Sequence, residues 1–170
     1  LPLLMEERDG RRFLVGHLMK NLDHHNAFLK NPQVLAVFTS PNVYVSGSWY
    51  SNPYTPSTWN YMSVHAKGMM RFVDESELKR ILRKTTLHFE SDDEGSPTTF
   101  DQLPSSLTDR LVKMIAGFEI EISSLKGVFK LSQDRDEDSY QRIIEKLRTK
   151  NEAARFIAAE MEERKDSVFS

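Results

Sequence analysis

The segment TWNYMSVHAKGMMRFVD, residues 58–74, constrains the fold of this chain more than any other stretch. It has room for one long β-strand, because its side chains separate into two alternating sets, as they do on the two faces of a strand. The two sets are Trp59, Tyr61, Ser63 and His65, and Asn60, Met62, Val64 and Ala66. Gly68 predicts a bulge or bend within this strand.

Several further segments have the pattern of strands. They lie at residues 1–5, 13–18, 34–40, 43–46, 118–122 and 125–132. Asp9-Gly10 predicts a hairpin turn between the first two of these strands. The continuous apolar run VLAVFTS at 34–40 predicts a strand that is buried on both faces.

Two carboxylates share one face of the predicted strand at 118–122. Glu119 and Glu121 alternate with Phe118, Ile120 and Ile122. Paired carboxylates serve acid–base chemistry in many sites, but a solvated strand face accounts for this alternation without any chemistry. We therefore predict that the two glutamates face solvent and that the apolar residues face the core. The last strand, at 125–132, follows after a turn at Lys126-Gly127 or runs through it.

Helical patterns lie between and after the strands. A short helix at 21–29 is expected to be capped by Asn21 or Asp23, and Asp74 with Glu77 predicts a capping-box start for a second helix. The expected apolar stripes are Leu78, Ile81 and Leu82 in the second helix, Leu107, Leu111, Met114 and Ile115 in a third, and Ile143, Ile144, Leu147, Ala153, Phe156 and Ile157 in the helices that follow Ser139. Residues 91–106 between the second and third helices predict a polar loop.

These elements predict an α+β protein that is mainly β, with flanking helices. Short strands joined mostly by hairpins favour a six-stranded antiparallel sheet closed into a small barrel over a doubly wound parallel sheet. A length of 170 residues favours one domain. We place it at residues 1–135, followed by a helical extension at 136–170. The chain opens on LPLLMEERDG without a methionine, which suggests a missing N-terminal piece.

The composition limits the classes of site and partner. Cysteine is absent, so disulfides, thiolate zinc sites and cysteine nucleophiles are excluded, and a cytoplasmic location is expected. A net charge of −2 gives little electrostatic support for binding DNA. No apolar run reaches the roughly 18 residues of a membrane span, so no membrane contact is expected. Glycine-rich phosphate loops and the common hydrolase and metalloprotease motifs are also absent.

Two clusters of charged or metal-binding residue types have simple structural explanations. The adjacent His24 and His25 point about 100° apart on a helix, so they do not chelate one metal ion together. The basic residues of the C-terminal helices alternate with glutamates, which is typical of a solvated helix face. We favour structural or surface roles for both clusters and predict no metal site.

The aromatic segment 45–61, VSGSWYSNPYTPSTWNY, is different. It holds both tryptophans of the chain and three of its five tyrosines among Ser, Thr, Asn, Gly and Pro. Trp and Tyr combine a flat apolar body with a polar edge, which suits a planar ligand or a partner surface. Plain core packing is the alternative. We favour a ligand site or an interface.

Several segments together resemble the PaiB-type regulators. The matching stretches are LPLL at 1–4, GHLMKN at 16–21, VLAVFTSPNVYVSGSWY at 34–50, TWNYMSVHAKG at 58–68, MIAGFEIEI at 114–122 and KLSQDR at 130–135. Two positions depart from the family pattern: Leu22-Asp23 stand where Asn-Pro is usual, and Asp134 stands where Asn is usual. The resemblance implies the flavin-binding split barrel of the pyridoxamine-phosphate-oxidase kind, a homodimer with FMN at its interface, and negative regulation of transcription.

The resemblance also implies a set of flavin-binding residues. Aromatic rings would form the walls of the flavin slot, and hydroxyl and amide groups would bind the polar edge of the flavin. Cations would bind its phosphate, and Arg135 is a further candidate for this role. The expected site residues are Lys20, Asn21, Ser46, Ser48, Trp49, Tyr50, Thr58, Trp59, Asn60, Tyr61, Lys130, Ser132 and Gln133. A flavin-dependent oxidoreductase and a scaffold that has lost its flavin remain alternatives. No residue is assigned as catalytic, so enzyme status stays open.

Overall fold

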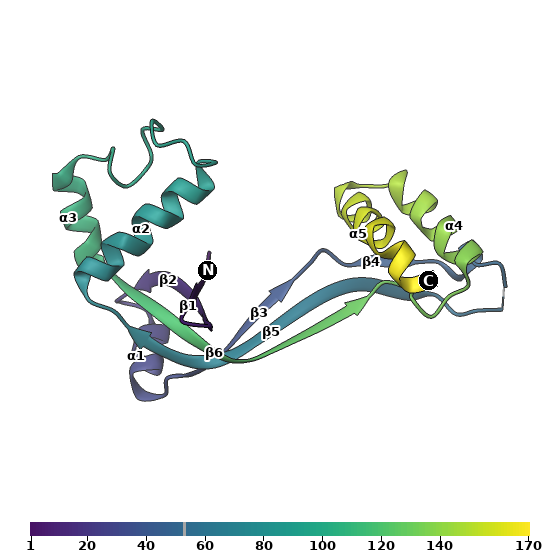
Figure 1. The fold of residues 1–170 in the computed structure, drawn as a ribbon, viewed down its shortest axis with the longest axis horizontal. Coiled ribbons are helices and arrows are strands. Elements are labelled where there is room, and N and C mark those ends of the chain that lie inside the picture. The colour runs from purple at the N-terminus through teal and green to yellow at the C-terminus, as the bar shows by residue number, and fades with distance from the viewer. Residues whose placement is uncertain (53) are drawn as a thin grey trace. The chain divides into compact units, whose positions relative to one another are not determined.

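The computed structural model describes residues 1–52 and 54–170. Within them lie six strands, five α-helices and one 3₁₀ helix (Figure 1). The elements are β1 (Leu4–Arg8), β2 (Arg11–Met19), α1 (Asp23–Lys30), β3 (Gln33–Thr39), β4 (Val43–Val45), η1 (Gly47–Trp49), β5 (Thr58–Phe72), α2 (Glu75–Phe89), α3 (Ser105–Met114), β6 (Ile115–Lys130), α4 (Glu137–Arg148) and α5 (Glu152–Phe169).

The six strands form an antiparallel sheet in the order β1-β2-β6-β5-β3, with β4 also paired to β5. The expectation of a six-stranded antiparallel sheet is therefore confirmed. The chain divides into two compact units: the first comprises residues 1–36 and 66–125, and the second comprises 37–65 and 126–170. The strands β3, β5 and β6 contribute residues to both units.

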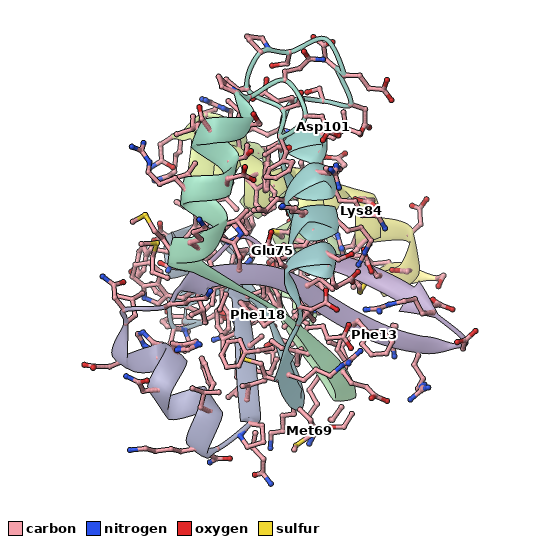
Figure 2. All side chains as sticks on the ribbon, turned by 90° about the vertical axis from the view of Figure 1, so that its left-hand side faces the viewer. Phe13, Met69, Glu75, Lys84, Asp101 and Phe118 are labelled. Atoms are coloured by element: carbon pink, nitrogen blue, oxygen red, sulfur yellow. The ribbon has the colours of Figure 1, made fainter. Side chains whose placement is uncertain are left out.

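The first unit begins with the expected hairpin. Arg8 pairs with Arg11 across the turn, and Asp9 and Gly10 have φ angles of 52° and 72°. Positive φ at both central residues is the conformation that Asp-Gly favours in two-residue hairpins. The hairpin packs on α2 through a core that includes Phe13, Val15 and Ile81. Figure 2 shows Phe13 on this unit, with Lys84 along α2.

A second core of the first unit lies between β2, β5 and β6. Leu14, Ala66, Phe118 and Ile120 are among its buried members. Strand β5 runs through Gly68 without interruption. A Cβ at this position would lie 2.2 Å from the carbonyl oxygen of Glu121, so the glycine permits a close approach of two backbones.

The helices of the first unit confirm some expectations and correct others. The Asp74 carboxylate accepts a hydrogen bond from the Glu77 amide at 2.9 Å, and Leu78, Ile81 and Leu82 are buried in α2 as predicted. In α3 the buried residues are instead Thr108 and Val112. The predicted stripe was wrong at Leu111 and Met114, which are exposed. The predicted caps of α1 were also wrong, because Leu22 occupies the N-cap position and makes no side-chain capping bond.

Two predictions of burial in the sheet were wrong. Glu119 is 2% exposed, although the alternation predicted a solvated side chain. Arg8 of β1 and Arg71 of β5 reach its carboxylate at 2.9 and 2.6 Å and replace the water that it would otherwise need. Conversely, Leu35 and Val37 of β3 are each 51% exposed, because β3 ends the strand order and has a neighbour on one side only.

The second unit is built around one apolar core, to which β4, β5, α4 and α5 contribute. The predicted stripe of Ile143, Ile144 and Leu147 is fully buried in α4, whereas Phe156 of α5 is 43% exposed. Strand β6 continues through Lys126-Gly127 to Lys130, so residues 118–130 belong to one strand and not to two. None of the helices in the described part of the chain combines the length and hydrophobicity that a membrane crossing requires.

Candidate functional site

The aromatic segment closes on itself through short polar contacts. The Ser46 hydroxyl accepts a hydrogen bond from the Ser48 amide at 3.3 Å and caps the 3₁₀ turn η1. The Gly47 amide donates to the Ser57 hydroxyl at 2.9 Å. A Cβ on Gly47 would lie 2.2 Å from the Thr55 carbonyl oxygen, so only glycine permits this approach. Ser46 and Ser48, both expected to bind a flavin, therefore shape the turn.

The same segment is tied to the start of α4. The Ser51 amide donates to the Ser139 hydroxyl at 2.8 Å, and the Ser51 hydroxyl donates to the Asp136 carboxylate at 3.0 Å. Asp136 caps α4 by accepting from the Ser139 amide at 2.8 Å. These hydrogen bonds, above all the one from the Ser139 amide, lower the pKa of Asp136 to about 2.

The first two rings of the segment pack inside the unit. Tyr50 is 5% exposed and belongs to the core, and Trp49 packs against that core. The Arg135 guanidinium lies 4.8 Å from the centre of the Tyr50 ring. The Tyr50 hydroxyl is buried without a hydrogen-bond partner in the described residues, and burial raises its pKa. Tyr50 thus has the surroundings of a core residue.

The alternation of β5 separates the remaining site candidates. Trp59 and Tyr61 are 51% and 37% exposed, whereas Asn60 between them is fully buried. The Asn60 side-chain oxygen accepts a hydrogen bond from the Ser132 hydroxyl at 2.9 Å. The Asn60 amide nitrogen lies 3.4 Å from the Met161 sulfur. Asn60 and Ser132 therefore connect β5 to the residues that follow β6.

The residues after β6 make a compact turn. Gln133 accepts a hydrogen bond from the Leu131 amide at 2.7 Å and donates to the Phe129 carbonyl. Ser132 has a φ of 62°, a conformation that side-chain residues seldom adopt, and it is held there by the bond to Asn60. The expected flavin contacts Ser132 and Gln133 thus have structural partners, and Lys130 is exposed at the end of β6.

Trp59 and Tyr61 line a pocket of about 360 Å³ on the second unit. Its other lining residues are Thr39, Ser40, Asn42 and Met62. The Ser40 hydroxyl is engaged, because it accepts from the Met62 amide at 2.8 Å and donates to the Pro41 carbonyl at 2.7 Å. The side chains of Thr39 and Asn42 form no hydrogen bond with any described residue. The pocket thus combines an aromatic wall with two available polar groups.

A second pocket, of about 250 Å³, is also lined by Trp59. It is enclosed by Asn42, Val43, Tyr44, Trp59, Leu147, Lys150, Asn151, Ala153 and Ala154. The rings of Tyr44 and Trp59 meet edge to face, with their centres 5.8 Å apart. We call the pocket with Tyr61 the ring pocket and the pocket with Lys150 the helix pocket.

Two of the expected site residues belong to the first unit. Lys20 donates from its ammonium group to the Lys113 carbonyl at 3.3 Å and lines a separate pocket of about 280 Å³ near the start of α2. Asn21 is exposed in the turn before α1. Thr58 is half-buried at the start of β5 and pairs with Val45. Of the thirteen expected residues, only Trp59 and Tyr61 line the ring pocket.

Sequence reasoning missed the polar members of the two pockets. Thr39, Ser40 and Asn42 lie where β3 ends and the chain turns toward β4. The Pro41-Asn42 pair is typical of a turn, and a turn beside an aromatic strand was the available signal. Lys150 and Asn151 lie between α4 and α5, remote in sequence, and no pattern marked them. The described residues contain no cluster of three metal-binding side chains.

Comparison with known proteins places the chain in a family. Residues 1–124 match the model of the family "Putative FMN-binding domain". The chain is also 32% identical over 165 residues to "Protease synthase and sporulation protein PAI 2" of Bacillus subtilis (strain 168), covering 96% of this chain and 79% of that protein. The chain belongs to the PaiB-type FMN-binding family. The expected family membership is thus confirmed.

Other relatives of this PaiB-type chain are more distant. "Uncharacterized protein AN0679" of Emericella nidulans is 31% identical over 157 residues, which cover 83% of this chain and 62% of the fungal protein. Among solved structures, the FAD and heme binding protein from Mycobacterium smegmatis aligns with a TM-score of 0.51 at 15% identity, over 74% of this chain and 63% of that one. This likeness concerns the fold alone, and it confirms the expected split barrel.

The ring pocket fits the flat part of the cofactor for which the PaiB-type family is described. An isoalloxazine ring needs an apolar wall and a few hydrogen-bonding groups at its pyrimidine edge. Trp59 and Tyr61 provide the wall, and Thr39 and Asn42 provide polar groups that bond to no other described residue. FMN is therefore a suitable cofactor for the residues present.

Proposed function

We propose that this protein binds FMN with the flavin ring against Trp59 and Tyr61, and that it acts as a PaiB-like negative regulator of transcription. The observation that carries the proposal is the exposed indole of Trp59 beside the available polar groups of Thr39 and Asn42. Trp59, Tyr44 and Tyr61 are exposed close together along β4 and β5, and a contiguous exposed apolar patch is typical of a ligand or partner site. When bound, FMN supplies hydride and electron transfer.

Two of the other expected site residues, Asn60 and Ser132, support the pocket from behind. Asn60 is buried beneath the exposed face of β5 and joins Ser132. Ser51 ties the aromatic segment to α4. In this proposal these groups hold Trp59 and Tyr61 in place and do not contact the cofactor. Supporting residues of this kind order a binding surface before the ligand arrives, which reduces the entropy lost on binding.

A homodimer is part of the proposal. Val37, Phe38 and Tyr44 are 51%, 39% and 50% exposed in the same unit as Trp59. A second copy of the chain that covered these residues would also enclose the ring pocket and exclude water from a bound flavin. Light scattering on the purified protein, with and without FMN, tests this; a monomer at micromolar concentration in both conditions contradicts it.

The regulatory role is supported by the Bacillus subtilis relative, whose name refers to protease synthesis and sporulation. The net charge of −2 argues against strong general binding to DNA. It favours regulation through a partner, or through a small basic patch on the protein. Binding to promoter fragments at 150 mM salt, measured with and without FMN, tests this role. A cytoplasmic location is also part of the proposal, and cell fractionation tests it.

The flavin proposal is tested by spectroscopy on the full chain. Protein produced with riboflavin supplied to the cells should be yellow, and titrated FMN should lose fluorescence as its ring stacks on Trp59. Trp59→Ala should weaken FMN binding roughly tenfold, because one aromatic stacking contact contributes on the order of 1 kcal/mol. Tyr54→Ala is the matched control, since Tyr54 is 93% exposed and lines neither pocket.

The proposal is contradicted if the unaltered protein shows no flavin absorption band and does not quench FMN fluorescence. It is also contradicted if Trp59→Ala and Tyr54→Ala lose affinity for FMN by the same factor. Reduction of the bound flavin by NADH or NADPH over many turnovers would instead favour an oxidoreductase.

A further inference from the structure

The ring pocket and the helix pocket adjoin each other. Both are lined by Trp59 and Asn42, so the indole of Trp59 forms a wall that the two pockets share. The volumes are about 360 and 250 Å³. A ligand whose flat ring occupies one pocket and whose flexible chain passes Asn42 reaches the other. FMN has this form, since a ribityl chain separates its ring from its phosphate.

Lys150 is the sole cationic residue that lines either pocket within the described chain. The cations that the sequence suggested for the phosphate do not line them: Lys20 belongs to the first unit, Lys130 is exposed at the end of β6, and Arg135 lies over the Tyr50 ring. A phosphate carries up to two negative charges, so it requires a cation or several N–H groups wherever it is partly removed from water.

The Lys150 backbone is held while its ammonium group remains available. Its amide donates to the Leu147 carbonyl at 3.0 Å, and its carbonyl accepts from the Arg155 guanidinium at 2.9 Å. The ammonium nitrogen lies 5.0 Å from the centre of the Trp49 ring, and no described carboxylate lies within 4.0 Å of it. A lysine anchored in this way can form a charge-assisted hydrogen bond without breaking an ion pair.

The surroundings of Lys150 favour an anion for a second reason. Helix α5 begins at Glu152, and Asn151, Ala153 and Ala154 of its first turn line the helix pocket. The N-terminus of an 18-residue helix carries a partial positive charge. The Asn151 side chain already caps this end by accepting from the Ala154 amide at 3.0 Å, so the helix adds to the potential while Lys150 supplies the contact.

We propose that Lys150 binds the phosphate group of FMN in the helix pocket, which rests on the proposed flavin site. On this proposal the α4–α5 turn, which lies beyond the residues 1–124 that match the family, makes the site selective for FMN over riboflavin. FMN and riboflavin share the ring and differ in the phosphate. The difference between their affinities therefore reports on phosphate binding in the helix pocket, and the affinity for riboflavin reports on ring binding in the ring pocket.

The test is a fluorescence titration of the full chain with FMN and, separately, with riboflavin. Lys150→Gln should weaken FMN binding roughly tenfold, the size expected for one hydrogen bond to a charged group. Riboflavin binding should change less than about twofold, and Lys150→Arg should retain most of the preference for FMN. Lys146→Gln is the matched control, because it removes the same charge from a residue that is exposed on α4 and lines neither pocket.

Three results would overturn the inference. The first is that Lys150→Gln and Lys146→Gln bind FMN with equal affinity. The second is that Lys150→Gln loses affinity for FMN and for riboflavin by the same factor, and the third is that the unaltered chain shows no preference for FMN. In each of these cases the ring pocket still binds a flavin and the proposed function stands. If the unaltered chain binds neither flavin, the proposed function itself is wrong and the inference falls with it.

Discussion

Glu119 illustrates how single residues in this fold depend on their neighbours. Its side chain is 2% exposed and receives hydrogen bonds from Arg8 and Arg71. Glu121, two residues later on the same strand, is 48% exposed and forms an ion pair with Arg11 at 3.1 Å. The two glutamates occupy the same face, yet one is a buried ionic centre and the other is a surface ion pair.

We expect Glu119→Gln to lower the free energy of unfolding by about 2 kcal/mol. The amide keeps the shape but loses the charge that holds two guanidinium groups, and hydrogen bonds to charged groups contribute about 1.5–3 kcal/mol. Glu121→Gln, the matched control, should cost less than about 0.5 kcal/mol, because exposed pairs contribute little. Urea denaturation at neutral pH measures both, and losses of similar size would contradict the assignment of Glu119 as a buried centre.

At the scale of elements, the start of α4 organises the aromatic segment. Ser139 is fully buried, accepts the Ser51 amide and donates to the Asp136 carboxylate at 2.8 Å. A helix cap is thereby shared with a loop that is 88 residues away in the sequence. This arrangement joins the helical end of the second unit to the segment that leads into Trp59.

Ser139→Ala should lower the free energy of unfolding by roughly 1–3 kcal/mol, because it leaves the Ser51 amide without its acceptor in a part-buried position. Ser167→Ala in α5 is the control, since its exposed hydroxyl only bonds the Arg164 carbonyl within the same helix. Thermal unfolding followed by tryptophan fluorescence compares the two variants. If Ser139→Ala proves as stable as Ser167→Ala, the contact does not stabilise the loop.

At the scale of the whole molecule, the core of the second unit is assembled from two remote stretches of chain. Val43, Val45, Tyr50 and Met62 meet residues of α4 and α5, which include Ile144 and Ile157. Most of the buried apolar side chains in that core come from the two helices. The sequence-based division into 1–135 and 136–170 remains a prediction about which part of the chain can fold alone.

We expect a chain that ends at residue 135 to lose the folded state of its 37–65 segment. Removal of α4 and α5 exposes Val45 and Leu131, which are fully buried in the complete chain, and the cost of exposing such side chains is about 1.5–3 kcal/mol each. Limited proteolysis followed by mass spectrometry should show rapid cleavage within 37–65 in the shortened chain only. A resistant 1–135 chain would contradict this and support the division at 135.

By itself, the sequence determined the elements whose signals are local. The Asp9-Gly10 turn, the Asp74 cap, the alternation of β5 and the apolar stripe of α4 depend on neighbours within a few residues, and all four appear in the structure. The family resemblance, carried by motifs spread over most of the chain, was sufficient for the family and the split barrel.

The tertiary structure decided what each side chain meets. It placed Tyr50 in a core while Trp59 lines a pocket, buried Glu119 between two arginines, and brought Lys150 into the lining of a pocket that Trp59 also lines. None of these outcomes follows from local pattern, because burial and charge pairing depend on which distant strands and helices become neighbours. The same alternation of residues therefore leaves Glu121 in an exposed ion pair and buries Glu119 among arginines.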